Sequence, residues 1–338
     1  MRIRNKLTKA VATLLLTLMC FSARAEYDFQ VNGLYYRVIS LENLTCACVD
    51  EHNTSNMHQK SKYKGNIIIP STVTFRERVF TVIEVAEAAF LKSDITSVRI
   101  GGSVKVIGKS AFSCCRELQR VILADGVDVI EPHAFSGCSK LRNVMLSNTL
   151  QSIGYSAFDG CNALSCEIVI PPSCKYVGEE ALPSSGEYSV RILDGAETLE
   201  IYKYGLGFSG GKTLYIGRNL SSGYYYVGVY EYQDVIIGDN VTVMPTCYRY
   251  YHDLGRIRTL VIGKNIITVP KIGMFDIGII RIRRPLPPKA EGFLDKVYTN
   301  SILYVPKGSL SEYKKADVWK NFWTIKEDVD ADPDGAVD

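Results

Sequence analysis

The stretch Ile107-Gly108-Lys109-Ser110-Ala111-Phe112 is one copy of a short pattern: a β-branched residue, three further residues, a small residue and an aromatic. Equivalent copies end at Phe90, Phe135 and Phe158, and a weaker fifth copy ends at Leu182. The four phenylalanines are spaced by 22, 23 and 23 residues. A fixed period in this range predicts a solenoid, in which each turn of chain adds one strand to a growing stack.

Short β-rich runs follow these copies and continue after the pattern fades, at intervals of 20 to 25 residues. The ten runs are 97–100, 120–123, 143–146, 168–170, 190–192, 214–216, 235–237, 260–262, 280–282 and 303–305. Their β-branched residues and period of two are typical of strands. We therefore predict a leucine-rich-repeat solenoid, a right-handed β/α or β/3-10 superhelix. Its ten rungs would form a parallel sheet roughly 45 Å long at about 4.8 Å per strand.

Glycine directly follows several of these runs, at Gly101, Gly217, Gly238 and Gly263. We expect tight corners there, with φ values that other residues resist.

Both ends of such a stack need caps, because a terminal rung exposes apolar side chains and strand edges. Residues 26–82 predict an N-terminal β-hairpin cap, with one hairpin around Asn32-Gly33 and another joining 72–75 to 79–82. Residues 307–326 predict a C-terminal cap built on a short amphipathic helix. Its side chains over the last rung would be Leu310, Tyr313, Trp319 and Phe322. Between the caps we expect regular repeats over 83–193 and irregular, Tyr-rich repeats over 194–306.

The two termini have distinct compositions. Residues 1–25 combine a basic start, an apolar stretch and an Ala23-Arg24-Ala25 cleavage site, which together predict a secretory signal peptide. No later segment reaches 18 unbroken apolar residues, so we expect no transmembrane segment. We predict an exported chain, extracellular or at the cell surface, with the periplasm as an alternative. Residues 327–338 are rich in Asp and predict an acidic, flexible tail.

The net charge and the absence of known catalytic motifs in the sequence argue against two classes of function, nucleic-acid binding and catalysis. The formal charge of +3 includes five basic residues of the signal peptide, which leaves −2 for the rest. That balance offers no basic stripe for nucleic acid. The four histidines have no neighbouring nucleophile or carboxylate motif, and no nucleophile elbow, phosphate loop or zinc-protease motif is present. We expect a protein that is not an enzyme, with no catalytic residues and no cofactor.

Three cysteines, Cys115, Cys138 and Cys161, each lie three residues after a phenylalanine of the pattern. In a solenoid they would stack, either as a redox or metal column or as a ladder of small buried side chains. The same position holds Ser93 and Ser185 in the flanking turns, which favours the ladder because serine does not ligate soft metals well.

Two further metal patterns are incomplete. Cys46-x-Cys48 with His52 and His58 offers zinc-type ligands, but the cysteines are closer than in usual zinc sites, so a disulfide or a free pair is favoured. The stretch 330–335 has the carboxylates and glycine of a calcium loop, but Pro333 stiffens it and the carboxylate at position 12 is missing. We predict no metal site.

These residues together resemble the BspA-like leucine-rich repeat family, whose members are typically secreted or surface proteins of anaerobic bacteria. The resemblance rests on the Ile107-Gly108…Ala111-Phe112…Cys115 phrase, on the entry phrase 69–73 and on the closing phrases 304–308 and 313–322. It is strong over 83–182 and at the C-terminal cap. It implies a solenoid for adhesion or recognition of host proteins or glycans, and it supplies no catalytic residues.

Alternate strand residues are expected to point outward on the inner, concave face of the solenoid. Apolar residues there are unusual unless something covers them, and Arg and Tyr concentrate binding energy at interfaces. The alternative is that β-propensity alone selected Ile, Val and Tyr on a strand surface. The candidate ligand-binding residues on this face are Arg99, Arg120, Ile122, Met145, Arg191, Tyr215, Ile236, Arg281 and Tyr304.

A second candidate is a cluster of tyrosines in the irregular repeats, where rings could stack on a sugar or a protein. Its residues are Tyr224, Tyr225, Tyr226, Tyr230 and Tyr232. The alternative is that these rings fill gaps left where the Ala-Phe pattern is missing. The predicted function is therefore recognition of a host or neighbouring-cell protein or peptide, with a glycan-binding protein or a structural spacer of the cell surface as alternatives.

Overall fold

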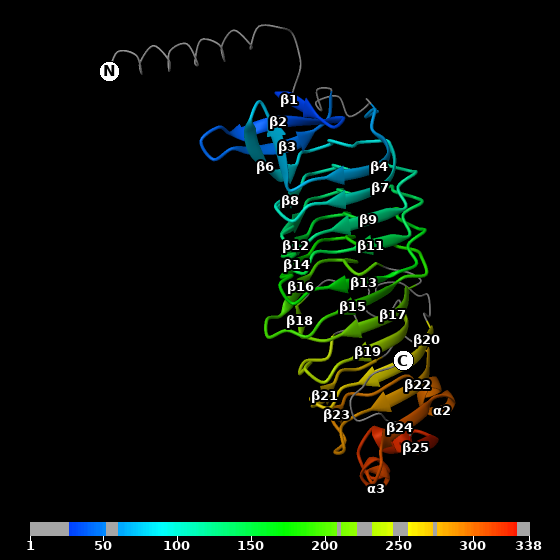
Figure 1. The fold of residues 1–338 in the computed structure, drawn as a ribbon. Coiled ribbons are helices and arrows are strands. Elements are labelled where there is room, and N and C mark those ends of the chain that lie inside the picture. The colour runs from blue at the N-terminus through cyan, green and yellow to red at the C-terminus, as the bar shows by residue number, and fades with distance from the viewer. Residues whose placement is uncertain are drawn as a thin grey trace, which may run out of the picture.

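The computed structural model describes residues 27–51, 60–207, 211–221, 232–245, 256–272 and 276–329. They form a parallel β-solenoid whose turns stack as a column, with hairpins at the N-terminal end and short helices at the C-terminal end (Figure 1). This confirms the predicted fold class. The predicted signal peptide and acidic tail lie outside the described residues, apart from positions 327–329, and the domain boundaries stay predictions.

One side of the column carries two parallel sheets. The N-terminal sheet consists of β4 (Lys64–Ile69), β7 (Asp94–Ile100), β9 (Arg120–Leu123) and β11 (Asn143–Met145). The C-terminal sheet consists of β13 (Glu167–Ile170), β15 (Ser189–Ile192), β17 (Gly211–Ile216), β19 (Tyr232–Ile237), β20 (Arg256–Ile262), β22 (Asp276–Ile282), β24 (Ile302–Pro306) and β25 (Thr324–Asp328). All ten predicted runs are strands here, and β4 and β25 add a rung at each end.

The predicted parallel rungs are present, but their ladder is interrupted between β11 and β13. At this point the Val144 N–H donates to the Cys166 thiol sulfur at 3.5 Å rather than to a backbone carbonyl. The chains still lie together, since the Ser165 N–H donates to the Arg142 carbonyl at 3.2 Å.

A second sheet along the column was not predicted. Its short parallel strands are β6 (Arg78–Val85), β8 (Val106–Ile107), β10 (Val129–Ile130), β12 (Ser152–Ile153), β14 (Tyr176–Val177), β16 (Leu199–Ile201) and β18 (Leu220–Ser221). The β-branched residue that opens each copy of the pattern is the buried last residue of such a strand, as at Val85, Ile107, Ile130 and Ile153. Nearer the C-terminal end, β21 (Thr268–Val269) and β23 (Lys289–Ala290) pair in the same parallel sense.

The N-terminal end contains both predicted hairpins. β1 (Phe29–Val31) pairs antiparallel with β2 (Leu34–Ser40) across Asn32-Gly33, and β5 (Thr72–Phe75) pairs antiparallel with β6. β3 (Thr45–Val49) then joins β2 to β6. These hairpins therefore extend the short-strand sheet past its first turn and cover that end.

The C-terminal end differs from its prediction. Instead of one amphipathic helix, the chain forms α2 (Asp295–Asn300), α3 (Leu310–Tyr313) and a 3-10 turn at Trp319–Asn321. Val318, directly before the 3-10 turn, has φ of 69°, which is outside helical geometry and separates that turn from α3. Tyr313, Trp319 and Phe322 are buried as expected, while Leu310 is partly buried against the core. None of the helices among the described residues is long and apolar enough to cross a membrane.

The core of the regular turns is a stack of phenylalanine rings. Phe90, Phe112, Phe135 and Phe158 have successive centroid distances of 4.8, 5.1 and 5.2 Å, with interplanar angles of 13° or less. The ring of Tyr63 continues this stack toward the N-terminal cap at 4.4 Å from Phe90. Because each turn of the solenoid contributes one ring to this stack, the sequence pattern recurs once per turn, every 22 or 23 residues.

The glycines after the strands serve a different purpose from the one predicted, because Gly101, Gly217, Gly238 and Gly263 have no positive φ. They are places where one turn touches the next. A Cβ on Gly101 would lie 2.6 Å from the Ser71 nitrogen, and one on Gly263 would lie 2.3 Å from the Gly238 oxygen.

We predict that Phe135→Ala lowers the free energy of unfolding by about 3–5 kcal/mol, because it removes a fully buried ring from the middle of the stack. Met145→Ala is the matched control, since this side chain is 62% exposed and its loss should cost about 0.5 kcal/mol or less. Urea denaturation followed by circular dichroism measures both. An unchanged midpoint for Phe135→Ala would contradict the role of the ring stack.

Candidate binding face

The candidate face is the solvent-facing surface of the two sheets, the one expected from the sequence to be concave. Side chains of successive strands lie in register on it. On the N-terminal sheet, one column runs through Ile68, Arg99, Ile122 and Met145. On the C-terminal sheet, the equivalent column is Val169, Arg191, Tyr215, Ile236, Val261, Arg281, Tyr304 and Lys326. The structure thus brings together all nine residues predicted for this face. Arg120 lies two residues before Ile122 on β9, in register with Ser97 and Asn143. Their contact with a ligand stays a prediction.

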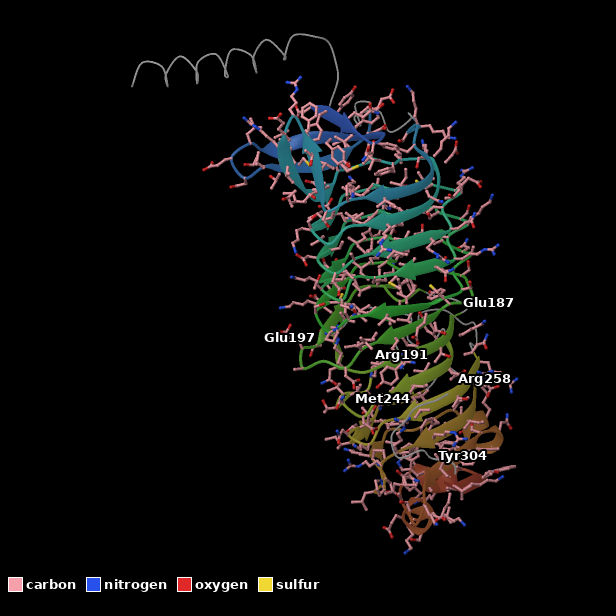
Figure 2. All side chains as sticks on the ribbon, in the orientation of Figure 1. Glu187, Arg191, Glu197, Met244, Arg258 and Tyr304 are labelled. Atoms are coloured by element: carbon pink, nitrogen blue, oxygen red, sulfur yellow. The ribbon has the colours of Figure 1, made fainter. Side chains whose placement is uncertain are left out.

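Arginines of the C-terminal sheet are held by carboxylates of neighbouring strands. Arg191 Nε donates to Glu167 Oε1 at 2.9 Å, and Arg258 Nε donates to Asp234 Oδ1 at 2.9 Å. Figure 2 shows Arg191, Arg258 and Tyr304 on successive parts of this sheet. These charges are satisfied within the protein.

The tyrosines of the same column are covered by guanidinium groups. The Arg191 guanidinium lies over the Tyr215 ring at 5.1 Å, and that of Arg281 lies over the Tyr304 ring at 4.6 Å. The Tyr215 hydroxyl contacts Asp194 Oδ1 at 3.2 Å. Burial, with the charge of Asp194 beside it, raises the pKa of Tyr215. One face of each ring is therefore already occupied.

The apolar residues of the C-terminal column are less exposed than expected. Val261 is only 7% exposed, and Ile236 is half-buried. The N-terminal sheet is different, because Ile68 is 68% and Met145 62% exposed. Ile68 was not among the predicted residues. It lies 31 residues before Arg99 rather than about 23, since the hairpin of β5 and β6 is inserted between them.

Arg281 is the most buried of the paired arginines on the face. Its Nη1 donates to both carboxylate oxygens of Asp328, at 2.5 and 2.6 Å, and so ties β22 to the last strand β25. The two side chains are 33% and 11% exposed. This arginine has a structural role that the sequence did not indicate.

The tyrosine cluster is only partly within the described residues. Tyr232 is 2% exposed and its hydroxyl donates to the Leu206 carbonyl at 2.7 Å, so its prediction as a ligand contact is wrong. A strand residue that points inward fills the core left without a phenylalanine there, as the packing alternative proposed. Tyr224, Tyr225, Tyr226 and Tyr230 lie outside the described residues.

The cysteines form a buried ladder. The thiols of Cys115, Cys138 and Cys161 donate to the carbonyls of Phe90, Phe112 and Phe135 at 2.9, 3.2 and 3.2 Å. Burial raises the pKa of Cys115 and of Cys138 well above the ordinary thiol value. Neutral thiols bonded to carbonyls are poor metal ligands, which supports the small-side-chain interpretation. Ser93 continues the ladder, whereas Ser185 is exposed and leaves it.

Cys46 and Cys48 are free and buried on β3, and burial raises the pKa of Cys46 to about 12. His52 and His58 lie outside the described residues. Within the residues that the structure describes, no group of three His, Cys, Asp or Glu side chains is arranged to hold a metal ion. His133 packs edge-on against Tyr155, with 4.9 Å between the ring centroids.

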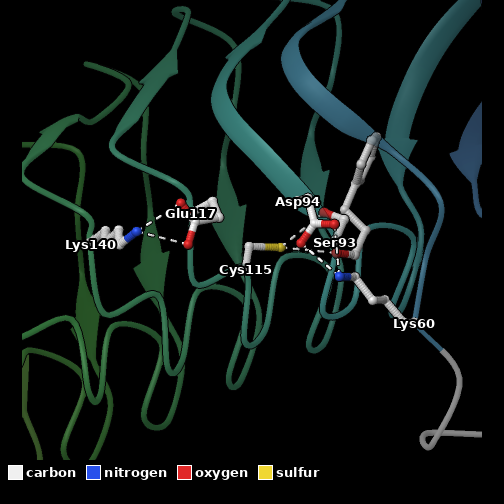
Figure 3. A network of polar contacts seen from close by, with 7 residues as sticks. Lys60, Ser93, Asp94, Cys115, Glu117 and Lys140 are labelled. Carbon is white, nitrogen blue, oxygen red and sulfur yellow. Dashed lines mark hydrogen bonds and ion pairs between the residues drawn. The ribbon is translucent and has the colours of Figure 1, made fainter.

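A hollow of about 410 Å³ opens beside the turns near the N-terminal cap. Its wall includes Lys60, Asp94, Cys114, Arg116 and Glu117. Lys60 contacts both Asp94 oxygens at 2.7 Å, and Lys140 contacts both Glu117 oxygens at 2.8 Å (Figure 3). Two carboxylates of the wall therefore form ion pairs that join neighbouring segments, and these pairs have a structural role.

The fold and the repeated core define this protein as a leucine-rich-repeat solenoid. Residues 71–189 match the model of the BspA type leucine rich repeat region in six copies. The predicted resemblance is confirmed. No curated protein sequence matches the chain.

Among solved structures, the chain is similar to bacterial leucine-rich repeat proteins. A T. pallidum leucine rich repeat protein, TpLRR, is 22% identical over 61% of this chain and 90% of its own, with a TM-score of 0.45. The pneumococcal vaccine antigen PcpA is 16% identical over 91% and 100%, with a TM-score of 0.37. A leucine rich cell surface protein from Faecalibacterium prausnitzii is 15% identical over 90% and 96%, with a TM-score of 0.31.

The cysteine ladder predicts selective alkylation. Iodoacetamide at about pH 8 should modify the partly exposed Cys114 and Cys166 of the folded chain and leave Cys115 and Cys138 unmodified until denaturant is added. Peptide mass spectrometry measures the sites. Because ionisation of the buried thiols is disfavoured only in the folded state, raising the pH through the ordinary thiol pKa of about 8.5 should also lower the free energy of unfolding. Rapid native alkylation of Cys138 would contradict the ladder.

The Arg281–Asp328 pair predicts a local effect. Asp328→Asn should destabilise β25 by about 1–2 kcal/mol, because it weakens two charge-assisted hydrogen bonds to a half-buried arginine. Amide hydrogen exchange of residues 324–328 measures the change. Asp317→Asn is the control, since its ion pair with Lys320 is exposed and its loss should leave the protection of these amides unchanged. Equal protection in both variants would show that the buried pair does not hold β25.

Proposed function

We propose that this chain is an exported, surface-exposed protein that recognises a protein or peptide partner through the outer face of its two parallel sheets, without catalysis and without a cofactor. The observation that carries the proposal is the register-matched column of Arg, Tyr and aliphatic side chains on a face where Ile68 and Met145 remain exposed. Large exposed apolar side chains amid arginine are typical of binding surfaces.

Several observations support an outward-facing binding role. The described helices all lie at the C-terminal end, so they leave the middle of the face uncovered (Figure 1). Residues 1–25 have the composition of a secretory signal peptide. A family of bacterial leucine-rich repeats is compatible with adhesion at a cell surface.

A peptide or protein fits this face better than a glycan does. Sugars stack on open aromatic faces, but Tyr215 and Tyr304 are each covered on one side by an arginine. A spacer without a ligand would give no reason for exposed Ile68 and Met145, which cost solubility.

The test is a binding screen of the purified protein against an array of host proteins and glycans. The face variant carries Arg120→Ala, Met145→Ala, Tyr215→Ala and Ile236→Ala. The matched control carries the same number of alanines at Val79, Tyr155, Val243 and Ile267, which are exposed side chains away from this face. We expect a protein ligand whose affinity for the face variant is at least about tenfold lower than for the unchanged protein, and whose affinity for the control variant is unchanged.

Three other results would contradict the proposal. A ligand that both variants retain would place recognition elsewhere, including the tyrosine turns. Glycan ligands alone would favour the glycan-binding alternative. The absence of any ligand would favour the spacer.

A further inference from the structure

We propose that the N-terminal sheet, rather than the whole face, is the docking site, and that its occupant is an extended acidic segment of a partner protein with interspersed apolar side chains. This inference rests on the proposed function and specifies where the partner binds and by what chemistry. In it, carboxylates bind Arg99 and Arg120, and apolar side chains lie on Ile68, Ile122 and Met145.

The first argument is the contrast in charge between the two sheets. On the C-terminal sheet, Arg191, Arg258 and Arg281 are all bound to carboxylates of their own chain. Within the described part of the chain, none of the ion pairs includes Arg99 or Arg120, although both side chains are exposed. The N-terminal sheet therefore has two arginines that are available to a partner.

The second argument is apolar exposure, which is independent of charge. Ile68 and Met145, the first and last members of the N-terminal column, are the only large aliphatic side chains of either described column that are more than half exposed. Ile122, between them, is half-buried. Unpaired arginines and exposed apolar side chains thus occur together on the N-terminal sheet. On the C-terminal sheet, Arg256 is exposed and is in none of the ion pairs of the described residues, but no large apolar side chain of that sheet is exposed beside it.

The register sets the shape of the site. Arg99 lies opposite Ile122, and Arg120 lies opposite Ser97, so the two arginines are diagonal neighbours on adjacent strands. Two guanidinium groups in this arrangement repel each other, and a carboxylate placed between them relieves the repulsion with charge-assisted hydrogen bonds. The column from Ile68 to Met145 spans three strand spacings, roughly 14 Å, which about four or five extended residues cover.

Charge complementarity selects the occupant. Lys64 is the other basic side chain on these strands, and Asn66, Ser97 and Asn143 complete the neighbouring column without an acid. Nucleic acid would need a longer basic stripe and would gain nothing from Ile68 and Met145. In an extended peptide every second side chain points to the same face, so a peptide that places carboxylate and apolar side chains in turn at every second position satisfies both features.

The test uses a fluorescent synthetic octapeptide, Ser-Glu-Ser-Leu-Ser-Glu-Ser-Leu, whose glutamates and leucines share one face when it is extended. Its binding to the purified protein is measured by polarisation at about physiological salt. The site variant is Arg99→Gln with Arg120→Gln. The control is Arg191→Gln with Arg258→Gln, which removes two arginines from the same face but from the paired sheet. We expect the site variant to weaken binding at least about tenfold and the control to change it less than about twofold.

Two peptide controls separate the contributions. Replacing glutamate by lysine should abolish binding, and replacing leucine by serine should weaken it by about tenfold, because the exposed apolar column is then left without a partner. Arg99→Lys with Arg120→Lys should give intermediate affinity, since lysine keeps the charge but loses the bidentate geometry.

Other outcomes would overturn the inference. Equal loss in the site and control variants, binding of the lysine peptide, or tighter binding of a heparin or DNA oligomer each contradict an acidic peptide as occupant. Absence of peptide binding also overturns it. The proposed function is tested separately, because it stands whenever a protein ligand of the array is lost by the face variant and retained by its control.

Discussion

Each turn of this molecule is held by its neighbours through a backbone ladder, and that ladder requires equivalent residues to lie in register from one turn to the next. Once register is fixed, every position becomes a column, so a side chain that suits one turn must suit the turns on both sides. The phenylalanine stack meets this condition with centroid distances of 4.8 to 5.2 Å, close to the strand spacing. The thiols of Cys115, Cys138 and Cys161 donate hydrogen bonds to the backbone carbonyls of Phe90, Phe112 and Phe135, each in the preceding turn.

The features that recur once per turn could be predicted from the sequence, because periodicity is visible without coordinates. The strands of the face, their register columns and the buried phenylalanines followed in this way. The short-strand sheet could not be predicted, since its strands have only two or three residues in most turns. A column of residues with positive φ precedes the Ala-Phe pair, at Ala88, Ser110, His133, Ser156 and Glu180. These residue types share no property that marks a left-handed conformation, so backbone contacts between turns impose it.

The sequence predicted less about the repeats that lack the Ala-Phe pattern. There the core is filled by other side chains, whose contacts join residues far apart in the sequence. Tyr188 and Tyr232 are buried, and their hydroxyls donate to the carbonyls of Pro183 and Leu206 at 2.7 Å. Arg218 is also buried, and its guanidinium donates to three carbonyls of Pro171, Pro172 and Cys174. Such residues appear in the sequence as exposed or ligand-binding types. Only the structure shows that the polar groups of Tyr232 and Arg218 are used to satisfy backbone carbonyls.

The same reasoning explains why composition alone could not rank the candidate face residues. Arg99, Arg191 and Arg281 occupy equivalent positions, yet Arg191 and Arg281 have carboxylate partners on other strands while Arg99 has none among the described residues. Whether an arginine of the column has a carboxylate partner depends on residues of other strands. Arg191 is paired with Glu167, which is two register positions away on the adjacent strand, and Arg281 is paired with Asp328 of the last strand, β25. An arginine that is already paired offers little to a ligand, because binding would have to break an existing ion pair. In a column of equivalent positions, the unpaired arginine is therefore the one most available for recognition.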